Sequence, residues 1–542
     1  ANPDLNLADV AWTLQVGRRA FDHRRTVVAS SVAQATDILS KRDRERLQTR
    51  SKPNDAPEIY FLFPGQGSQH PNMAREIYET EPVFRETVDR CAELLWPHLD
   101  ADLRTLLYPA AGASEDVKRS VTETVNAQPA IFTIEYALAQ LWMSWGIRPK
   151  AMAGHSIGEF VAACLAGVIS LEDALGIVAL RGRMMQNLPA GGMLSVRLPE
   201  ADLRKRLPAS LSLAAVNSPS LCVVAGALEP LGQFERELTE GGVACRRLVT
   251  SHAFHSGMMD PLIESLAGAL AKTNLHPPQI PYVSGVTGTW IAAAEATDPI
   301  YWARHARDPV QFSAAVRELR RNPQAVLLEV GPGNVLATLA RQHSGFPANQ
   351  VIVSSLSDGF SGEGDSQALL GALGALWLAG AQPDWSRLSD GEQRRRVSLP
   401  TYPFERKRHW LESVPELNQL PQLAGVQALD EAESRINQGI QTVNIASNDT
   451  TLTSATVPTD NRGNQIRAAL AEMFGDLSGV DISQADGATS FLELGFDSLF
   501  LTQVVQALHE KFGAKVTFIR RCGNSDGIAD ELEVSIARRC GQ

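Results

Sequence analysis

The chain has 542 residues, which at about 150 residues per domain predicts three to four domains. Its 50 Lys and Arg residues against 61 Asp and Glu residues leave a formal net charge of −11, which excludes a generally basic nucleic-acid-binding surface. Hydrophobic residues at 44% and charged residues at 20% are ordinary for soluble globular proteins and exclude a disordered or fibrous chain.

The sequence shows no pattern typical of a membrane span, an export signal or a metal centre. The longest apolar run, 368–381, is shorter than the roughly 20 residues that cross a bilayer, and the N-terminal residues show no basic segment followed by an apolar one. The six cysteines form no CxxC pair, so we expect reduced thiols rather than disulfides or a zinc knuckle. These features predict a cytoplasmic protein without a metal.

A repeated pattern of strand, tight turn and helix begins near residue 59. The apolar run Ile59–Phe63 ends in Pro-Gly-Gln-Gly, and the runs 151–153 and 325–330 also end in glycine-containing turns. Strands that alternate with helices indicate a parallel sheet covered on both faces. We therefore predict an α/β core.

Shorter elements follow between residues 193 and 249, in the order strand, helix, strand, strand, helix, strand. We place the strands at 193–198, 211–216, 221–225 and 244–249, and the helices at 201–207 and 228–239. This order is typical of a ferredoxin-like subdomain. It would be inserted into the larger α/β core, with a cleft between the two.

The composition changes after residue 410. Residues 447–459 are mostly Ser, Thr, Asn, Asp and Ala and bury too little apolar surface to offset chain entropy, so we predict a flexible tether. From about residue 465, apolar side chains recur on one helical face, at Ile466, Leu470, Met473 and Phe474. This pattern predicts a small all-α domain at the end of the tether.

The segment Gly-His-Ser156-Ile157-Gly follows a predicted strand and precedes a predicted helix, which is the context of a nucleophile elbow. Glycines flank the serine because the turn leaves no room for Cβ atoms, and the hydroxyl would stand over the helix N-terminus. The main-chain N–H of Ile157 is the natural donor to an oxyanion there. On this motif alone, a buried serine in a glycine-rich turn is the alternative.

A nucleophilic serine requires a base, and His255 in the segment Ser-His-Ala-Phe-His255-Ser is the candidate. His252 and His255 are three residues apart, which leaves a metal pair open, but no carboxylate or cysteine stands beside them at ligand spacing. A pair of structural histidines is a further alternative.

Three other positions stand out by residue type. Arg181 offers a planar guanidinium to a carboxylate, although an arginine in a helix at 174–185 also fits a surface position over the sheet. Gln66 lies in the glycine-rich turn 65–69, which offers another N–H to an oxyanion. Ser498 begins a predicted apolar helix after Gly-Phe-Asp, either as an ordinary N-cap or as an exposed hydroxyl that receives a modification.

Together these motifs resemble those of modular type I polyketide synthases. Residues 63–69, the Gly-His-Ser-Ile-Gly-Glu segment, Arg181 and the His-Ala-Phe-His segment resemble the acyltransferase domain, and Leu-Gly-Phe-Asp-Ser-Leu resembles the phosphopantetheine attachment site of an acyl carrier protein. Residues 13–19 resemble the linker between ketosynthase and acyltransferase, and residues 399–404 resemble the segment after the acyltransferase. The resemblance covers nearly all of the chain except the tether and the C-terminal end.

The resemblance implies an α/β-hydrolase-like acyltransferase core with a ferredoxin-like insert, followed by a helical-bundle carrier domain. By position, Ser156 would be the nucleophile and His255 its general base, with the N–H groups of Gln66 and Ile157 as the oxyanion hole. In such enzymes a main-chain carbonyl orients the base, and His305 occupies that position here.

The resemblance also implies a substrate. Arg181 would pair with the free carboxylate of a malonyl-type extender unit, and His252 and Phe254 would set specificity. Members with His-Ala-Phe-His generally take malonyl, whereas those with Tyr-Ala-Ser-His usually take methylmalonyl. Phe254 would fill the space that an α-methyl group needs, although one methyl group is worth only about 1–3 kcal/mol of discrimination.

The implied reaction moves malonyl from coenzyme A to Ser156 and then to the thiol of 4′-phosphopantetheine carried on Ser498. The implied partners are malonyl-CoA, a phosphopantetheinyl transferase and other synthase domains, especially a ketosynthase, without a metal, nucleic acid or membrane. The implied division is a partial linker at 1–55, the acyltransferase at 56–350 with its insert at about 190–250, its end and following linker at 351–411, the tether at 412–462 and the carrier domain at 463–542.

Three alternatives stay open. An α/β-hydrolase or thioesterase would share the Ser156 elbow and hydrolyse its acyl group, with an acid such as Glu172 or Asp173 orienting the base. The same transferase could use methylmalonyl. A carrier and docking module with an inactive acyltransferase is the third, although each catalytic position holds the expected residue.

Both ends of the chain depart from the family pattern. The N-terminal linker begins midway, so we expect a piece of a larger synthase. After Phe518 only Ile528, Leu532 and Ile536 indicate a closing helix, which predicts an altered end of the carrier domain.

Overall fold

The computed structural model describes residues 5–43, 46–51, 56–110, 112–114, 120–347, 349–357 and 364–401. The chain divides into two units, Ala1–Ser398 and Leu399–Gln542, and all described helices and strands belong to the first. The predicted tether, the predicted carrier domain and Ser498 lie outside the described residues.

A five-stranded parallel sheet forms the centre of the first unit, in the order β11-β10-β3-β4-β9. These strands are β3 (Ile59–Phe63), β4 (Ala151–Gly154), β9 (Tyr282–Val283), β10 (Val326–Glu329) and β11 (Ile352–Ser354). Every residue of β3 is buried, as expected for a central strand that is covered on both faces. The parallel sheet that the sequence predicts is confirmed.

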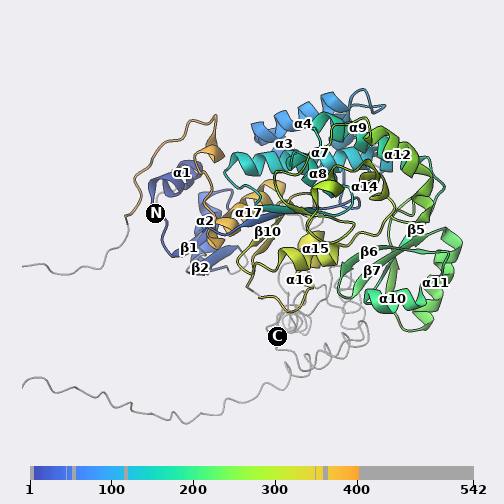
Figure 1. The fold of residues 1–542 in the computed structure, drawn as a ribbon. Helices are drawn as coiled ribbons and strands as arrows, with labels where there is room; N and C mark the ends of the chain where they lie inside the picture. Colours follow the sequence, from blue (N-terminus) through green and yellow to red (C-terminus); the bar gives the residue numbers. More distant parts are fainter. Residues whose placement is uncertain are drawn as a thin grey trace, which may run out of the picture. The chain divides into compact units, whose positions relative to one another are not determined.

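Helices cover both faces of this sheet (Figure 1). On one side lie α3 (Arg75–Thr80), α4 (Pro82–Leu95), α7 (Thr124–Ser144), α8 (Gly158–Leu165) and α9 (Leu171–Gln186), and on the other lie α15 (Phe312–Leu319) and α16 (Val335–Arg341). Helix α7 packs against α4, α8 and α9, which explains why most of its side chains are buried.

The predicted insert is a separate four-stranded antiparallel sheet in the order β6-β7-β5-β8. Its elements are β5 (Gly192–Val196), α10 (Glu200–Arg206), β6 (Ser212–Ser218), β7 (Leu221–Gly226), α11 (Leu228–Glu240) and β8 (Cys245–Arg247). The predicted order of strands and helices is therefore found. The insert has a small core of its own, which includes Leu194, Phe234 and Leu238.

Residues that precede and follow the core pack together on the side of the unit away from the insert (Figure 1). This layer contains α1 (Leu7–Gly17), β1 (His23–Val27), α2 (Val32–Lys41), β2 (Leu47–Ser51) and α17 (Asp365–Ala379). Arg24 donates to the main-chain carbonyl of Trp377 at 2.7 Å, and its guanidinium lies 5.0 Å from the indole centroid. These contacts join β1 to α17.

The remaining elements are short, and some of them border the site. They are α5 (Leu103–Leu107), η1 (Gly257–Leu262), α12 (Ile263–Leu270), α13 (Ala293–Ala296), α14 (Pro299–Arg304) and η2 (Arg387–Ser389). None of the helices among the described residues is long and apolar enough to cross a membrane.

The loop after α14 joins the insert to the core. The main-chain N–H of Val216 donates to the carbonyl of Val310 at 2.8 Å, and the N–H of Val310 donates to the carbonyl of Ala214 at 2.9 Å. This isolated bridge to β6 holds the insert beside the end of β4, where the candidate site lies.

Candidate active site

The turn after β4 holds Ser156 in a strained backbone conformation. Ser156 has φ 51°, in the left-handed region that non-glycine residues rarely adopt. A Cβ atom at Gly158 would overlap the main-chain carbonyl of Phe63, and one at Gly154 would overlap the main-chain nitrogen of Glu159. The two glycines are therefore required by space, and the serine hydroxyl is presented at the start of α8.

The serine and histidine from separate motifs meet at this turn. Ser156 Oγ lies 2.8 Å from Nε2 of His255, and Nδ1 of His255 lies 3.0 Å from the main-chain carbonyl oxygen of Asp308. A carbonyl oxygen only accepts, so Nδ1 carries the hydrogen and Nε2 is free to accept the hydroxyl proton. This is the arrangement of a nucleophile and its base.

The predicted source of the orienting carbonyl is wrong by three residues. His305 continues the helical conformation at the end of α14, with φ −53° and ψ −30°, so its carbonyl points along the helix axis. The chain turns after this residue and presents the carbonyl of Asp308 to the base instead. The side chain of His305 points to Glu159, 3.0 Å away.

Burial sets the protonation of the base. Desolvation, followed by the positive charge of Arg181, holds the pKa of His255 well below its ordinary value. The His255 imidazole is therefore neutral near pH 7, which is the form that accepts a proton.

Arg181 lies in the core rather than on the surface, so the surface interpretation is wrong. Its side chain is 2% exposed, and burial lowers its pKa to about 9. Nη1 donates to Oε1 of Gln128 on α7 at 2.6 Å, whereas Nε has no hydrogen-bond partner among the described residues. The guanidinium also lies 5.9 Å from the ring centroid of Phe160. A buried cation with unused donors is a site for an anion.

Two main-chain N–H groups are available beside the serine. A Cβ at Gly65 would lie 3.5 Å from Cβ of Ser156, which places the glycine-rich turn against the elbow. Within the described part of the chain, the N–H groups of Gln66 and Ile157 donate no hydrogen bond. The side-chain amide of Gln66 donates to Thr124 Oγ1 at 3.3 Å, which fixes its position.

His252 and Phe254, the predicted specificity residues, lie in the segment that leads to His255. His252 is 4% exposed, its Nε2 lies 3.1 Å from the carbonyl of Leu188, and its Nδ1 lies 2.7 Å from Ser251 Oγ. Phe254 is also buried, and the centroid of its ring lies 6.1 Å from that of the His252 ring. Both imidazoles of the motif are thus engaged with non-metal partners, and no group of three or more potential metal ligands occurs among the described residues.

Sequence reasoning missed several residues that complete the site. Gln128 on α7 supports Arg181, and Asn217 on β6 lies 2.9 Å from Nε2 of His155, the residue before Ser156. Burial lowers the pKa of His155. A carbonyl such as that of Asp308 leaves no mark in the sequence, and an isolated Gln or Asn carries no spacing signal.

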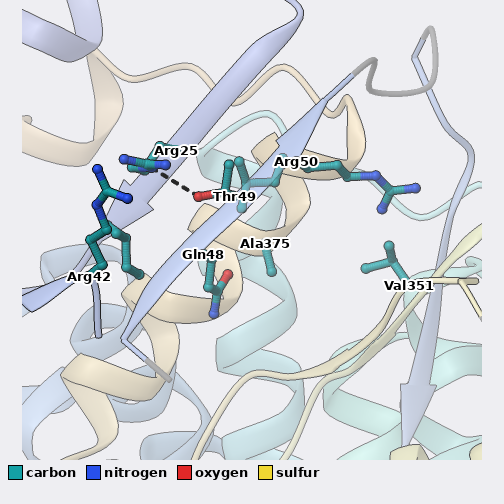
Figure 2. Close-up of a pocket in the computed structure, with 9 residues that line it drawn as sticks. Arg25, Arg42, Gln48, Thr49, Arg50, Val351 and Ala375 are labelled. Atoms are coloured by element: carbon teal, nitrogen blue, oxygen red, sulfur yellow. Dashed lines mark hydrogen bonds between the residues drawn. The ribbon is translucent and has the colours of Figure 1, made fainter. Parts of the chain in front are cut away.

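A hollow of ≈ 570 Å³ lies between β2 and α17 (Figure 2). Arg25, Arg42 and Arg50 line it, and Nε of Arg25 donates to Thr49 Oγ1 at 3.0 Å. It contains none of the predicted site residues and no serine, histidine or cysteine.

Comparisons with known proteins show which domain families the chain matches. The family model "Acyl transferase domain" matches residues 60–354, the model "CurL-like, PKS C-terminal" matches residues 1–39, and the model "Phosphopantetheine attachment site" matches residues 468–519.

Three individual relatives are representative. A phenolphthiocerol/phthiocerol polyketide synthase of Mycobacterium tuberculosis H37Rv is 34% identical over 513 residues, covering 92% of this chain and 33% of that protein. The acyl transferase domain of ZmaA is 39% identical with TM-score 0.69, covering 74% of this chain and 92% of that one. Malonyl-CoA:acyl carrier protein transacylase from Xanthomonas oryzae pv. oryzae is 28% identical with TM-score 0.51, and the match covers 59% of this chain and 99% of that one.

The fold and the family model together define an acyltransferase, in which Ser156 and His255 lie within hydrogen-bond distance. The chain belongs to the acyl transferase domain family, and it carries the acyltransferase and phosphopantetheine attachment domains of a type I polyketide synthase. It spans about a third of the length of the curated mycobacterial relative.

Proposed function

We propose that this acyltransferase takes malonyl from malonyl-CoA and passes it, through an ester on Ser156, to a carrier thiol. The observation that carries the proposal is the buried guanidinium of Arg181 near the Ser156–His255 pair, because a free carboxylate on the acyl group would compensate that charge.

In the first half-reaction, Oγ of Ser156 attacks the thioester carbonyl carbon while its proton passes to Nε2 of His255. The N–H groups of Gln66 and Ile157 hold the oxyanion that forms. The carbon–sulfur bond then breaks, and His255 returns the proton to the departing thiolate. The acyl group remains as an ester on Ser156.

In the second half-reaction, His255 takes the proton of an incoming thiol, and the sulfur attacks the ester carbonyl carbon to form a new carbon–sulfur bond. The ester carbon–oxygen bond then breaks, and His255 returns the proton to Oγ of Ser156. Phosphopantetheine, when attached to Ser498, supplies that thiol. Ser498 lies outside the described residues, and the matched model at 468–519 supports this assignment.

A hydrolase fits the site less well. A hydrolase of the α/β type orients its histidine with a carboxylate, but here the main-chain carbonyl of Asp308 meets Nδ1 of His255. The guanidinium of Arg181 is also buried without a carboxylate partner among the described residues, and a thioesterase for uncharged acyl groups would not supply one. These two observations favour transfer of an acidic acyl group over hydrolysis.

We favour malonyl over methylmalonyl because Phe254 is buried, and we infer that its ring fills the space that an α-methyl group would need. A Phe254→Ser variant is expected to raise the methylmalonyl to malonyl ratio of kcat/KM about tenfold, with His252 unchanged. An unchanged ratio in competition with both thioesters would argue that other residues set the choice.

We also propose the finer fold and domain assignments. The antiparallel order β8-β5-β7-β6 supports a ferredoxin-like insert at about 190–250 within an α/β-hydrolase-like acyltransferase at 56–350. The proposed flanks are a linker at 1–55, a linker at 351–411, a tether at 412–462 and a helical carrier domain at 463–542, supported by the matched models at 1–39 and 468–519. A ketosynthase and a phosphopantetheinyl transferase are the proposed partners.

Onward transfer is tested on the full chain after treatment with a phosphopantetheinyl transferase and coenzyme A. Peptide mass spectrometry after malonyl-CoA should find malonyl on phosphopantetheine at Ser498, and a Ser498→Ala variant should retain it at Ser156. Free malonate released at the rate of thioester consumption, with no labelled Ser498 peptide, would favour the hydrolase.

A further inference from the structure

A buried polar cluster lies behind the Ser156–His255 pair. The carboxylate of Glu159 is completely buried in the first turn of α8, three residues beyond the nucleophile. Its Oε2 lies 3.0 Å from Nε2 of His305 and accepts the main-chain N–H of Gly285 at 2.8 Å. Its Oε1 accepts the hydroxyl of Tyr301 at 2.5 Å. Three donors therefore converge on one carboxylate.

Two of these donors come from one face of the same helical stretch. Tyr301 lies in α14 and His305 is its C-terminal cap, four residues further on. Nδ1 of His305 has no partner among the described residues, and the ring packs edge-on against Phe160 at 5.5 Å. The contact with Glu159 is thus the polar anchor of His305.

The segment that begins at His305 holds the base. The main-chain N–H of His255 donates to the carbonyl of Ala306 at 3.3 Å, and Nδ1 lies 3.0 Å from the carbonyl of Asp308. The His255 and His305 rings lie 6.2 Å apart at 79°. Residues 305–308 therefore connect the Glu159 cluster to the main-chain N–H and to Nδ1 of His255.

We propose that Glu159 is a positioning residue for the base: by anchoring Tyr301 and His305, it fixes the segment whose carbonyls hold His255. Glu159 also belongs to the helix that follows Ser156, so one buried carboxylate sets the relative positions of nucleophile and base. The inference rests on the proposed function, in which His255 is the general base.

The test is single-turnover acylation of Ser156 by malonyl-CoA, which measures the rate constant and the amplitude separately. Glu159→Gln places an amide against Nε2 of His305, and the limiting rate constant should fall roughly 10- to 100-fold, because displacements of about 1 Å cost rates of that order. The half-saturating malonyl-CoA concentration should not change, since Arg181 and Gln128 are untouched. A merely structural role would lower the amplitude, which counts folded molecules, and leave the rate constant alone.

Two further variants keep the test decisive. His305→Phe keeps a ring in the aromatic surroundings but removes the bond to Glu159, so its rate constant should also fall, and it decides the matter if Glu159→Gln does not fold. Ser313→Ala is the matched control, because Ser313 Oγ lies 2.9 Å from Nε2 of another buried histidine, His343. This control should lower the melting temperature and leave the rate constant unchanged.

A fluorophosphonate probe separates this inference from the proposed function, because its reaction with Ser156 needs the base but no acyl substrate. If the wild-type chain reacts with the probe but not with malonyl-CoA, the proposed function fails, and the probe rates of the variants still decide the role of Glu159. Rate constants within about twofold of wild type in Glu159→Gln and His305→Phe would overturn the inference.

Discussion

The guanidinium of Arg181 donates to the side-chain oxygen of Gln128 at 2.6 Å, and no carboxylate among the described residues pairs with it. The amide of Gln128 is held in turn, since its Nε2 lies 3.2 Å from Sδ of Met185. A neutral amide orients the buried cation without neutralising it. The charge is thereby left to attract an acid from outside the chain.

Arg181→Ala should weaken transfer of acidic acyl groups selectively. Hydrogen bonds to charged groups contribute about 1.5–3 kcal/mol, so kcat/KM for malonyl-CoA should fall roughly 10- to 150-fold. The value for acetyl-CoA should stay level or rise. Arg183→Ala is the matched control, because Arg183 stands two residues along the same helix and is exposed. Equal losses for both thioesters would show that Arg181 only supports the fold.

The pH dependence of acylation should reflect the buried base. Because burial and then Arg181 hold the pKa of His255 well below 6.5, the acylation rate should be level above about pH 6.5 and fall only at lower pH. In Arg181→Ala the fall should move to higher pH, since one cause of the low pKa is gone. An acid limb centred at pH 6.5 or above in the wild type would contradict a desolvated base.

The same shift affects folding. In the unfolded chain His255 binds a proton near its ordinary pKa, whereas in the folded chain it stays neutral to lower pH. Its contribution to stability is therefore fully present above about pH 6.5 and is lost as the pH falls below that value.

Asp308 should act through its main chain alone. Its carbonyl meets the base, whereas its carboxylate pairs with Arg304 at 3.1 Å. Asp308→Asn should therefore change the acylation rate less than about threefold, whereas loss of a true triad aspartate costs on the order of 10⁴-fold. Stopped-flow acylation of both proteins decides this, and a fall of that larger order would revive the hydrolase interpretation.

Glu135 on α7 should lower the free energy of unfolding as the pH rises. Both of its carboxyl oxygens are buried without a partner among the described residues, and burial followed by the charge of Glu329 raises its pKa well above the ordinary value. Burial also raises the pKa of Glu329 to about 7. Acids that hold their protons in the folded state destabilise it as the pH rises above their ordinary pKa.

Replacing this group should therefore stabilise the fold. Glu135→Leu is expected to raise the free energy of unfolding by about 1–3 kcal/mol at pH 8, and by less at pH 5. Denaturant titrations at the two pH values measure the difference. A variant that is less stable than wild type at pH 8 would contradict this prediction and would mean that the carboxyl group of Glu135 stabilises the fold.

Local patterns predicted the elements, and residue type pointed to Ser156 and His255 as a pair that should meet. Strand Ile59–Phe63 and the order of the insert follow from short apolar runs bounded by glycine and proline. Ser156 and His255 carry their chemistry in their side chains, and the structure brings them within 2.8 Å.

Features that depend on tertiary packing were not predictable. Every residue has a carbonyl, so nothing in the sequence favours Asp308 over His305 as the group that orients the base. Gln128 reaches Arg181 only because α7 packs on α9. Glu159 meets Tyr301 of α14, which is 142 residues away in the sequence. Such partners are set by helix packing rather than by spacing in the sequence.

The central claim is that Ser156 carries the acyl group. Intact-protein mass spectrometry of the chain without phosphopantetheine, within seconds of adding malonyl-CoA, measures this directly. The account predicts one malonyl group on the wild-type chain, none on Ser156→Ala, and slow loading of His255→Ala. A malonyl group on Ser156→Ala, or thioester consumption with no acylated protein at any time, would contradict it.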